Sequence, residues 1–279
     1  MIKILDGKEL SAKLTQRLVR SIGKSSVKPT LLIIQIGDLD RSNTYIEKKK
    51  SFGKNIGISV LHKKYKDSVS EKEVISQILK YNADQKIHGI IVQLPIPKKF
   101  NTGRIIESIS QEKDIDGLTA KNTKLLFDNK EGFVPAATKG IITLLKHSKI
   151  SLSGKRVVMV GDSALVGRPT ALAILNKKAT VTICHSKTRD LAGETKRAEI
   201  LIVAAGHPNL ITKNHVSKGQ IVIDVGITVT KGKKIIGDVD YKNVSKIVKA
   251  ITPVPGGVGP MTVFSLFGNL IEAYKKQLD

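Results

Sequence analysis

The chain has little of what a disulfide-stabilised or membrane-embedded protein needs. Its only cysteine is Cys184, so no internal disulfide can form and a reducing compartment is expected. No apolar run approaches the roughly 18 to 20 residues that cross a bilayer. The apolar patch at the N-terminus is short and is interrupted by Asp6 and Glu9, unlike a secretion signal. We therefore expect a cytoplasmic protein with no membrane partner.

Two further scarcities limit the possible ligands. Tryptophan is absent and aromatic residues make up only 4% of the chain, so a basic groove interleaved with stacking rings is not expected. There is no HExxH or CxxC motif, and no metal-ligand spacing among the histidines, so we expect no metal cofactor. The six histidines lie far apart, at His62, His88, His147, His185, His207 and His215.

Positive charge, by contrast, is in large excess. The chain has 47 Lys and Arg against 24 Asp and Glu, a formal net charge of +23. Three interpretations are open: phosphate contacts with a nucleic acid, attraction of small polyanions such as a phosphorylated cofactor or a polycarboxylate, and a drift toward lysine without functional content. Because the charge is diffuse and aromatics are few, we expect no nucleic-acid partner.

The pattern of apolar residues predicts an α/β protein of two domains, in line with a length of 279 residues. Residues 8–22 carry leucine or isoleucine every fourth position and predict a helix. Strands and helices then alternate at 29–37, 42–57, 58–65, 71–83 and 88–97, which indicates a parallel sheet. A second alternating series begins at 155 and continues past a basic turn near 231–233. It predicts a doubly wound, Rossmann-type nucleotide-binding domain. We expect domains at 1–136 with 265–279, and at 137–264.

The lysine triplet of "SNTYIEKKKSF" contains one residue that differs from its neighbours. On a helix at about 100° per residue, Lys49 lies about 40° from Tyr45 and shares an apolar stripe with Phe52 and Ile56. Lys50 points nearly the opposite way. An amine drawn into an apolar face loses solvation, which lowers its pKa toward values useful for proton transfer. Snorkelling, with the charge kept in water, is the alternative.

Two other stretches place polar groups where α/β proteins bind ligands. Gln93 in "VQLP" follows a predicted strand at its carboxyl end, where its amide could orient a lysine. Asp114 and Asp116 in "EKDIDG" precede a glycine turn, and capping of that turn is the ordinary reading of such a pair.

Taken together, these motifs resemble the bifunctional methylenetetrahydrofolate dehydrogenase/methenyltetrahydrofolate cyclohydrolase family over nearly the whole chain. The resemblance rests on "SNTYIEKK", "GIIVQLPIP", "EKDIDG", "VGDSALVGRP", "VTICHSKT" and, most specifically, "ITPVPGGVGPMT". It implies oxidation of 5,10-methylenetetrahydrofolate to the methenyl form with NADP, and hydrolysis to 10-formyltetrahydrofolate. It also implies a homodimer serving one-carbon metabolism and purine biosynthesis.

The resemblance also assigns roles to individual residues. It makes Lys49 the catalytic lysine, Tyr45 a lining of the folate pocket, Gln93 the group that tunes the lysine and Asp116 the anchor of the pterin ring. A carboxylate suits the amino-pyrimidinone edge of a pterin because it can accept two parallel hydrogen bonds. The full expected substrate set is Tyr45, Lys49, Gln93, Leu94, Asp116, Pro255, Gly256 and Gly257.

The predicted cofactor site begins at "VVMVGDSALVGRP", a strand, small residues and a helix start that suit a diphosphate. "CHSK" and "AAGHP" follow later strands in the same way. Asp224 with Gly226 ends a further strand, where it could face the cofactor or only cap the turn. The expected cofactor residues are Gly161, Asp162, Ser163, Val166, Gly167, Pro169, Ser186, Lys187, Ala205, Gly206 and Ile227.

Two stretches depart from the family pattern. Asp162 stands where the family has an arginine for the 2′-phosphate of NADP, and its charge would repel that phosphate. Ser186, Lys187 and Arg189 could hold the phosphate instead, so NADP is favoured over NAD or dual use. In "FVPAATKG", Ala136, Ala137 and Thr138 replace Cys, Thr and Pro, which is expected to loosen a loop. A cyclohydrolase-only protein and an NAD-dependent dehydrogenase are the resulting alternatives, and a basic nucleic-acid-binding protein is the alternative from another class.

Overall fold

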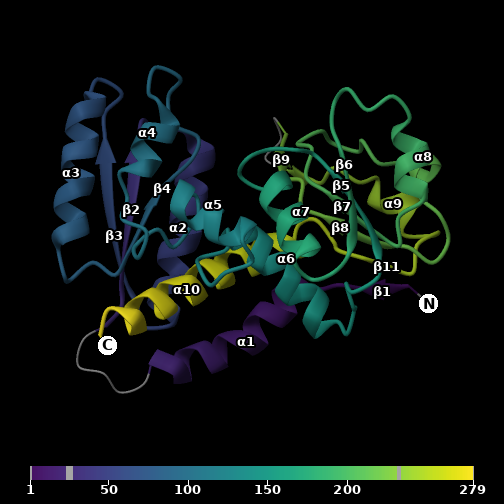
Figure 1. Ribbon diagram of the computed structural model, residues 1–279, viewed down its shortest axis with the longest axis horizontal. Helices are drawn as coiled ribbons and strands as arrows, with labels where there is room; N and C mark the ends of the chain where they lie inside the picture. Colours follow the sequence, from purple (N-terminus) through teal and green to yellow (C-terminus); the bar gives the residue numbers. More distant parts are fainter. Residues whose placement is uncertain (1, 23–27, 231–233, 279) are drawn as a thin grey trace. The chain divides into compact units, whose positions relative to one another are not determined.

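The computed structural model describes residues 2–22, 28–230 and 234–278 (Figure 1). Its contacts divide the chain into two compact units, named here after their main sheets. The three-stranded unit comprises Leu14–Ala136 and Val263–Asp279, and the six-stranded unit comprises Met1–Lys13 and Ala137–Thr262. The basic turn expected at 231–233 lies outside the described residues. Of the described helices, none combines the length and apolarity that crossing a membrane requires.

The three-stranded unit is built on a fully parallel sheet, as the alternation of strands and helices predicted. Its strands lie in the order β3-β2-β4. They are β2 (Thr30–Ile36), β3 (Ser59–Tyr65) and β4 (Gly89–Val92). The helices within this unit are α2 (Asp40–Asn55), α3 (Glu71–Ala83), α4 (Thr102–Glu107) and α5 (Ala120–Phe127). The short helices α4 and α5 were not predicted.

The central strand β2 is buried on both faces because successive side chains point to opposite sides. Leu31 and Ile33 belong to an apolar cluster with residues of α2 and of α10 (Val258–Lys276). Leu32 and Ile34 belong to a second cluster, with residues of α3 and α4. These two clusters fix the helices against the sheet, and therefore fix where α2 presents its lysines.

The six-stranded unit has the doubly wound form that the sequence predicted. Its strands lie in the order β1-β11-β8-β7-β5-β6, and every pairing is parallel. They are β1 (Lys3–Ile4), β5 (Arg156–Val160), β6 (Thr180–Cys184), β7 (Ile200–Val203), β8 (Ile221–Asp224) and β11 (Ala250–Ile251). Further elements are α6 (Ala136–His147), α7 (Gly167–Leu175), α8 (Leu191–Lys196), η1 (Lys213–His215), α9 (Tyr241–Val244) and a hairpin of β9 (Thr228–Val229) and β10 (Ile235–Ile236).

The N-terminal residues lie in a different unit from the one expected. We predicted that residues 1–136 would form one domain, whereas Met1–Lys13 pack with the six-stranded unit. The reason is a non-local pairing, since β1 runs parallel to β11 and the amide of Lys8 donates to the carbonyl of Gly256 at 2.8 Å. The division therefore passes through α1 (Gly7–Ile22), whose periodicity alone gave no sign of it.

The segment expected to be a loosened loop begins a helix instead. Residues 136–138 open α6, where both Ala136 and Thr138 are buried. The hydroxyl of Thr138 hydrogen bonds with that of Thr170, in α7, at 2.8 Å. Threonine in place of proline thus adds a helix-to-helix hydrogen bond, which a proline could not make.

Two buried carboxylates organise the carboxyl edge of the six-stranded sheet. Asp224 accepts from the amides of Gly226 at 2.9 Å, Asp238 at 3.0 Å and Val239 at 3.0 Å. Asp238, which is fully buried, accepts from the amides of Ala205 and Gly206 at 2.7 Å each. Asp224 therefore caps turns of the chain itself, the second of the two readings left open by the sequence, and Asp238 fixes the turn after β7.

The ionisation of Asp224 should make stability depend on pH. Burial raises the pKa of this carboxyl from 3.8 to about 6, with the three backbone amides opposing the rise. Because the folded pKa exceeds the unfolded one, the proton-linked stabilisation is complete below about pH 4 and is lost as pH rises through about 6, a change on the order of 3 kcal/mol. We expect urea unfolding to show a fall in the free energy of unfolding over this window, and Asp224→Asn to flatten it. Equal slopes in the two proteins would contradict the assignment.

Candidate functional site

The central feature of the three-stranded unit is a hydrogen bond between Lys49 and Gln93. The Lys49 Nζ, on α2, donates to Gln93 Oε1 at 2.8 Å. Gln93 is buried just beyond β4, and its Nε2 donates to the carbonyl of Leu94 at 2.8 Å while its backbone amide donates to Ile34 at 2.8 Å. The amide group is thereby held with its oxygen facing the lysine. The sequence predicted both residues, and the structure brings them together.

The three lysines of the triplet differ as the helical periodicity predicted. Lys48 is exposed and lies over the ring of Tyr45, with its Nζ 5.5 Å from the ring centroid. Lys50 forms an ion pair with Glu47 at 2.8 Å. Only Lys49 reaches Gln93, and burial lowers the pKa of its amine, an effect that the nearby charge of Asp116 partly opposes. A lowered pKa raises the fraction of neutral amine, the form that can accept a proton.

The two aspartates of "EKDIDG" have separate environments. Asp114 is buried and accepts from the amides of Leu118 and Thr119 and from the side chain of Asn122, so it holds the turn. No described residue donates a hydrogen bond to the carboxylate of Asp116. Burial raises the pKa of Asp116, and the charge of Lys49 opposes this rise. Of the pair, Asp116 is therefore the carboxylate left for a ligand, beside an amine of opposite charge.

The first βα turn of the six-stranded unit allows close approach of the backbone. Gly161 has φ +107°, and a Cβ on it would overlap the carbonyl of Ala204. A Cβ on Gly167 would overlap the carbonyl of Gly161, so neither position accepts a larger residue. The Ser163 hydroxyl accepts from the amides of Val166 and Gly167 at 3.3 Å each, which caps the start of α7.

Asp162 has a partner that the sequence did not suggest. Its carboxylate lies 3.5 Å from the guanidinium of Arg168, on the first turn of α7. Both side chains are exposed in large part, so the pair is screened by water, but it supplies a positive charge directly beside the negative one. A family arginine is absent at 162, yet a guanidinium lies close to that position. The sequence pattern did not predict this ion pair, because the two residues are six positions apart and belong to a turn and a helix.

The remaining predicted cofactor residues follow strands of the same sheet. Ser186 and Lys187 are exposed in a tight turn after β6, where the amide of Lys187 donates to His185 Nδ1 at 3.1 Å. Ala205 and Gly206 follow β7, held by Asp238. Pro169 is buried in α7, and Ile227 follows β8. The carboxyl ends of parallel strands meet at one edge, so the structure brings these residues to the same side of the sheet.

The proline- and glycine-rich stretch lies before α10. Gly256 has φ +113°, and Gly257 donates its amide to the carbonyl of Pro253 at 2.8 Å. A Cβ on Gly7 would overlap the carbonyl of Gly257, so α1 begins against this loop. Pro255, Gly256 and Gly257 all lie in the six-stranded unit, unlike the other predicted substrate residues.

Within the described residues, no three His, Cys, Asp or Glu side chains form a metal-ligand group.

Comparisons with known proteins cover both units. Residues 5–116 match the catalytic domain of tetrahydrofolate dehydrogenase/cyclohydrolase, and residues 135–278 match the NAD(P)-binding domain of that family. The bifunctional protein FolD of Geotalea daltonii is 42% identical, covering 99% of this chain and 100% of that protein.

Solved structures agree with the sequence matches. The bifunctional FolD enzyme of Campylobacter jejuni is 41% identical, with a TM-score of 0.97 over 99% of each chain. The Trypanosoma brucei dehydrogenase-cyclohydrolase, solved with NADP and an inhibitor, is 29% identical, with a TM-score of 0.95 over 99% of this chain and 98% of that one. The chain belongs to the tetrahydrofolate dehydrogenase/cyclohydrolase family, which confirms the family predicted from its motifs.

Proposed function

We propose that the protein oxidises 5,10-methylenetetrahydrofolate to 5,10-methenyltetrahydrofolate with NADP and hydrolyses the product to 10-formyltetrahydrofolate. The observation that carries this proposal is the 2.8 Å hydrogen bond between Lys49 Nζ and Gln93 Oε1, next to the charge of Asp116. The family assignment gives the reaction its two steps, and this arrangement of amine, amide and carboxylate gives it a proton carrier and a substrate anchor.

In the oxidation, the C–H bond of the bridging methylene breaks and its electron pair leaves as hydride. Bound NADP supplies the acceptor for that hydride. The role of Asp116 is to hold the substrate, because a carboxylate can accept two hydrogen bonds from the amino-pyrimidinone edge of the pterin. Its half-buried position strengthens those bonds, since a less polar surrounding screens them less. Tyr45, one turn before Lys49 on α2, and Leu94, next to Gln93, would line the same pocket.

In the hydrolysis, water adds to the methenyl carbon and the bond from that carbon to N5 breaks. The water loses one proton as it adds and its second as the new hydroxyl becomes the formyl C=O. N5 gains one of these two as the ring opens, so one proton is released. Neutral Lys49 can accept the first proton and return one to N5, because its pKa is lowered by burial. Gln93 accepts one N–H of the amine, which leaves the lone pair directed elsewhere, toward the substrate.

The residues around Gly161 fit a diphosphate and support NADP as the cofactor. The glycines leave room for close approach, and the Ser163 hydroxyl, already accepting from two amides, keeps its own proton for a phosphate oxygen. Arg168 offsets the charge of Asp162, and Ser186 and Lys187 supply exposed donors nearby on the same edge. An NAD-dependent dehydrogenase and a cyclohydrolase without oxidation are the alternatives that Asp162 raises.

The setting of the reaction is inferred from the cysteine content and from the family. We place the protein in the cytoplasm because its single cysteine is buried and unpaired. The family resemblance supports a homodimer, and the 10-formyl product links it to one-carbon metabolism and purine biosynthesis.

Replacing Lys49 should remove the cyclohydrolase step selectively. We expect Lys49→Ala to lower the rate of methenyltetrahydrofolate hydrolysis by about 10²- to 10⁴-fold, the range for loss of a general acid or base. Lys50→Ala is the matched control, because it removes the adjacent lysine, whose partner is Glu47. Following the absorbance of the methenyl form measures both variants. Equal hydrolysis rates in Lys49→Ala and Lys50→Ala would show that Lys49 is not the proton carrier.

Gln93→Glu should move the pH profile of hydrolysis. A carboxylate at the position of Gln93 Oε1 favours the ammonium form of Lys49 and raises its pKa. Since the neutral amine accepts the proton, the rising limb of rate against pH should shift to higher pH. Gln93→Met, which removes the hydrogen bond without adding charge, should lower the rate without that upward shift. If the midpoint of the pH profile were unchanged in Gln93→Glu, Gln93 would not influence the ionisation of Lys49.

Arg168→Ala should weaken the preference for NADP. With the guanidinium gone, the charge of Asp162 is uncompensated and repels a 2′-phosphate. We expect kcat/KM with NADP to fall about five- to tenfold, kcat/KM with NAD to change little, and Asp162→Asn in the Arg168→Ala background to restore NADP use. Initial rates with both nicotinamides provide the test. If the unmodified protein reduced neither NADP nor NAD but still hydrolysed methenyltetrahydrofolate, it would be a cyclohydrolase without the oxidation step.

A further inference from the structure

A second site candidate lies at the amino-terminal edge of the six-stranded sheet. A cavity of about 540 Å³ is lined there by residues that begin strands, among them Lys3 of β1, Arg156 of β5, Ile221 of β8 and Ala250 of β11. Because all strands of this sheet are parallel, their first residues share one edge and their last residues share the other. The cavity therefore lies at the edge opposite Gly161 and the other predicted cofactor residues.

The lining carries a strong excess of positive charge. Eight lysine and arginine residues line the cavity, against one acidic residue, Glu199. Glu199 is already engaged, since one oxygen pairs with Lys155 at 2.7 Å and the other accepts from the amide of Arg156 at 3.0 Å. Lys196, Lys218 and Lys249 have no acidic partner among the residues that the structure describes. Basic residues without a carboxylate partner leave this part of the sheet edge positively charged, and that charge attracts an anion.

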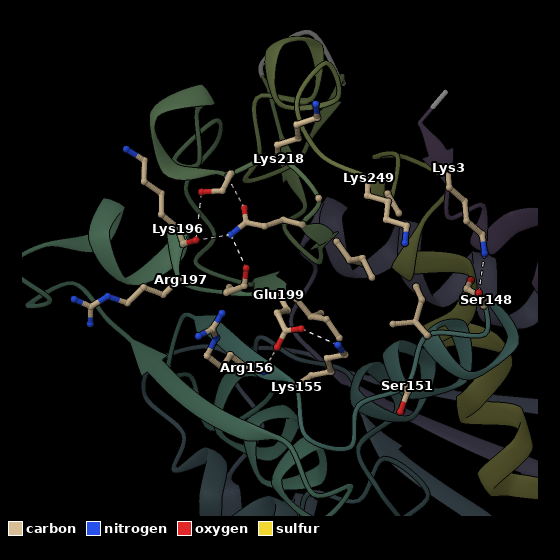
Figure 2. A pocket seen from close by; sticks show the side chains of 18 of the residues that line it. Lys3, Ser148, Ser151, Lys155, Arg156, Lys196, Arg197, Glu199, Lys218 and Lys249 are labelled. Carbon is tan, nitrogen blue, oxygen red and sulfur yellow. Dashed lines mark hydrogen bonds and ion pairs between the residues drawn. The ribbon is translucent and has the colours of Figure 1, made fainter.

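The basic residues that line the cavity do not follow one stripe of surface. Figure 2 shows Lys196, Lys218, Lys249 and Lys155 on different sides of Glu199, with the side chains of Lys196 and Lys218 extending away from it. They come from segments far apart in sequence, so the fold brings these residues to one cavity.

A buried glutamine orders the backbone that lines this cavity. Gln220 is 3% exposed. Its Nε2 donates to the carbonyls of Thr195 at 2.8 Å and Ala198 at 2.7 Å, and its Oε1 accepts from the amide of Ser217 at 2.7 Å. One side chain thus joins the end of α8, the turn before β8 and the start of β8. The backbone positions of Lys196 and Lys218 are fixed by this network before any ligand arrives, which reduces the cost of ordering the site.

The chemistry of the lining selects for phosphate groups. Ser148 and Ser151 also line the cavity, and their hydroxyls can donate to phosphate oxygens, whereas the Ser217 hydroxyl already donates to the carbonyl of Lys196 at 3.3 Å. None of the described lining residues is aromatic, so the cavity offers no ring on which a nucleobase could stack. A cavity lined by many basic residues and a single carboxylate matches a compact ligand with several negative charges. We propose that this cavity binds a small oligophosphate through its phosphate groups.

Binding is tested on the full chain with sodium tripolyphosphate as the probe, followed by titration calorimetry. We expect one saturable site per chain, with orthophosphate at least tenfold weaker because it presents fewer charges. Lys218→Glu with Lys249→Glu should weaken tripolyphosphate binding at least tenfold. The matched control is Lys242→Glu with Lys246→Glu, which makes the same change in net charge at exposed positions of the same unit outside the cavity. It should change affinity by no more than about twofold.

A competition experiment separates the two edges of the sheet. Tripolyphosphate should bind with the same affinity when NADP is saturating, because the proposed sites lie at opposite ends of the strands. Displacement by NADP would put the anion at the cofactor edge and overturn the proposal. If both double variants bound tripolyphosphate equally weakly, the effect would come from net charge and the proposal would be wrong. It would also be wrong if the unmodified protein showed no saturable binding. Thermal unfolding without ligand confirms that both variants fold.

Discussion

The three-stranded unit depends on keeping one amine partly out of water next to an amide and a carboxylate. An isolated buried ammonium is costly, and the cost is met here by a hydrogen bond to Gln93 and by the charge of Asp116. Burial pushes the pKa values of Lys49 and Asp116 toward each other, down for the amine and up for the acid. A lowered pKa raises the neutral fraction of the lysine, and the neutral amine is the form that can accept a proton from a reacting group.

Packing sets that geometry more firmly than the polar contacts do. Ile46 of α2 is fully buried in the same cluster as Leu31 and Ile33 of β2, so the helix that carries Lys49 is fixed to the strand beside β4. Gln93 follows β4 directly, and its amide donates to Ile34. The distance between amine and amide is thus a consequence of helix-to-sheet packing, and the hydrogen bond reports that packing.

The sequence predicted the elements whose signals are local, and missed those that depend on distant partners. Apolar periodicity located α1, α2 and α3 and most of the strands, and it separated Lys49 from Lys48 and Lys50 because a helix turns by a fixed angle per residue. Two-residue strands such as β1 and β11 carry no periodic signal, so the pairing that draws the N-terminus into the six-stranded unit was not foreseen. The role of Asp238 was missed for the same reason, since its amide donors lie more than thirty residues earlier.

The two edges of the six-stranded sheet have opposite electrostatic character, and this bears on the meaning of the +23 charge. At the carboxyl edge, Asp224 accepts from the chain's own amides through both oxygens, Asp238 does so through Oδ2, and Asp162 faces Arg168, so the acids there have local partners. At the amino edge, eight Lys and Arg residues line a cavity with a single, already paired carboxylate. Drift toward lysine would add charge wherever the surface tolerates it, and it gives no reason for so many basic residues to line one cavity whose backbone is ordered by Gln220. Composition alone could not separate drift from attraction of small anions, but the placement of the charges favours anions at this edge.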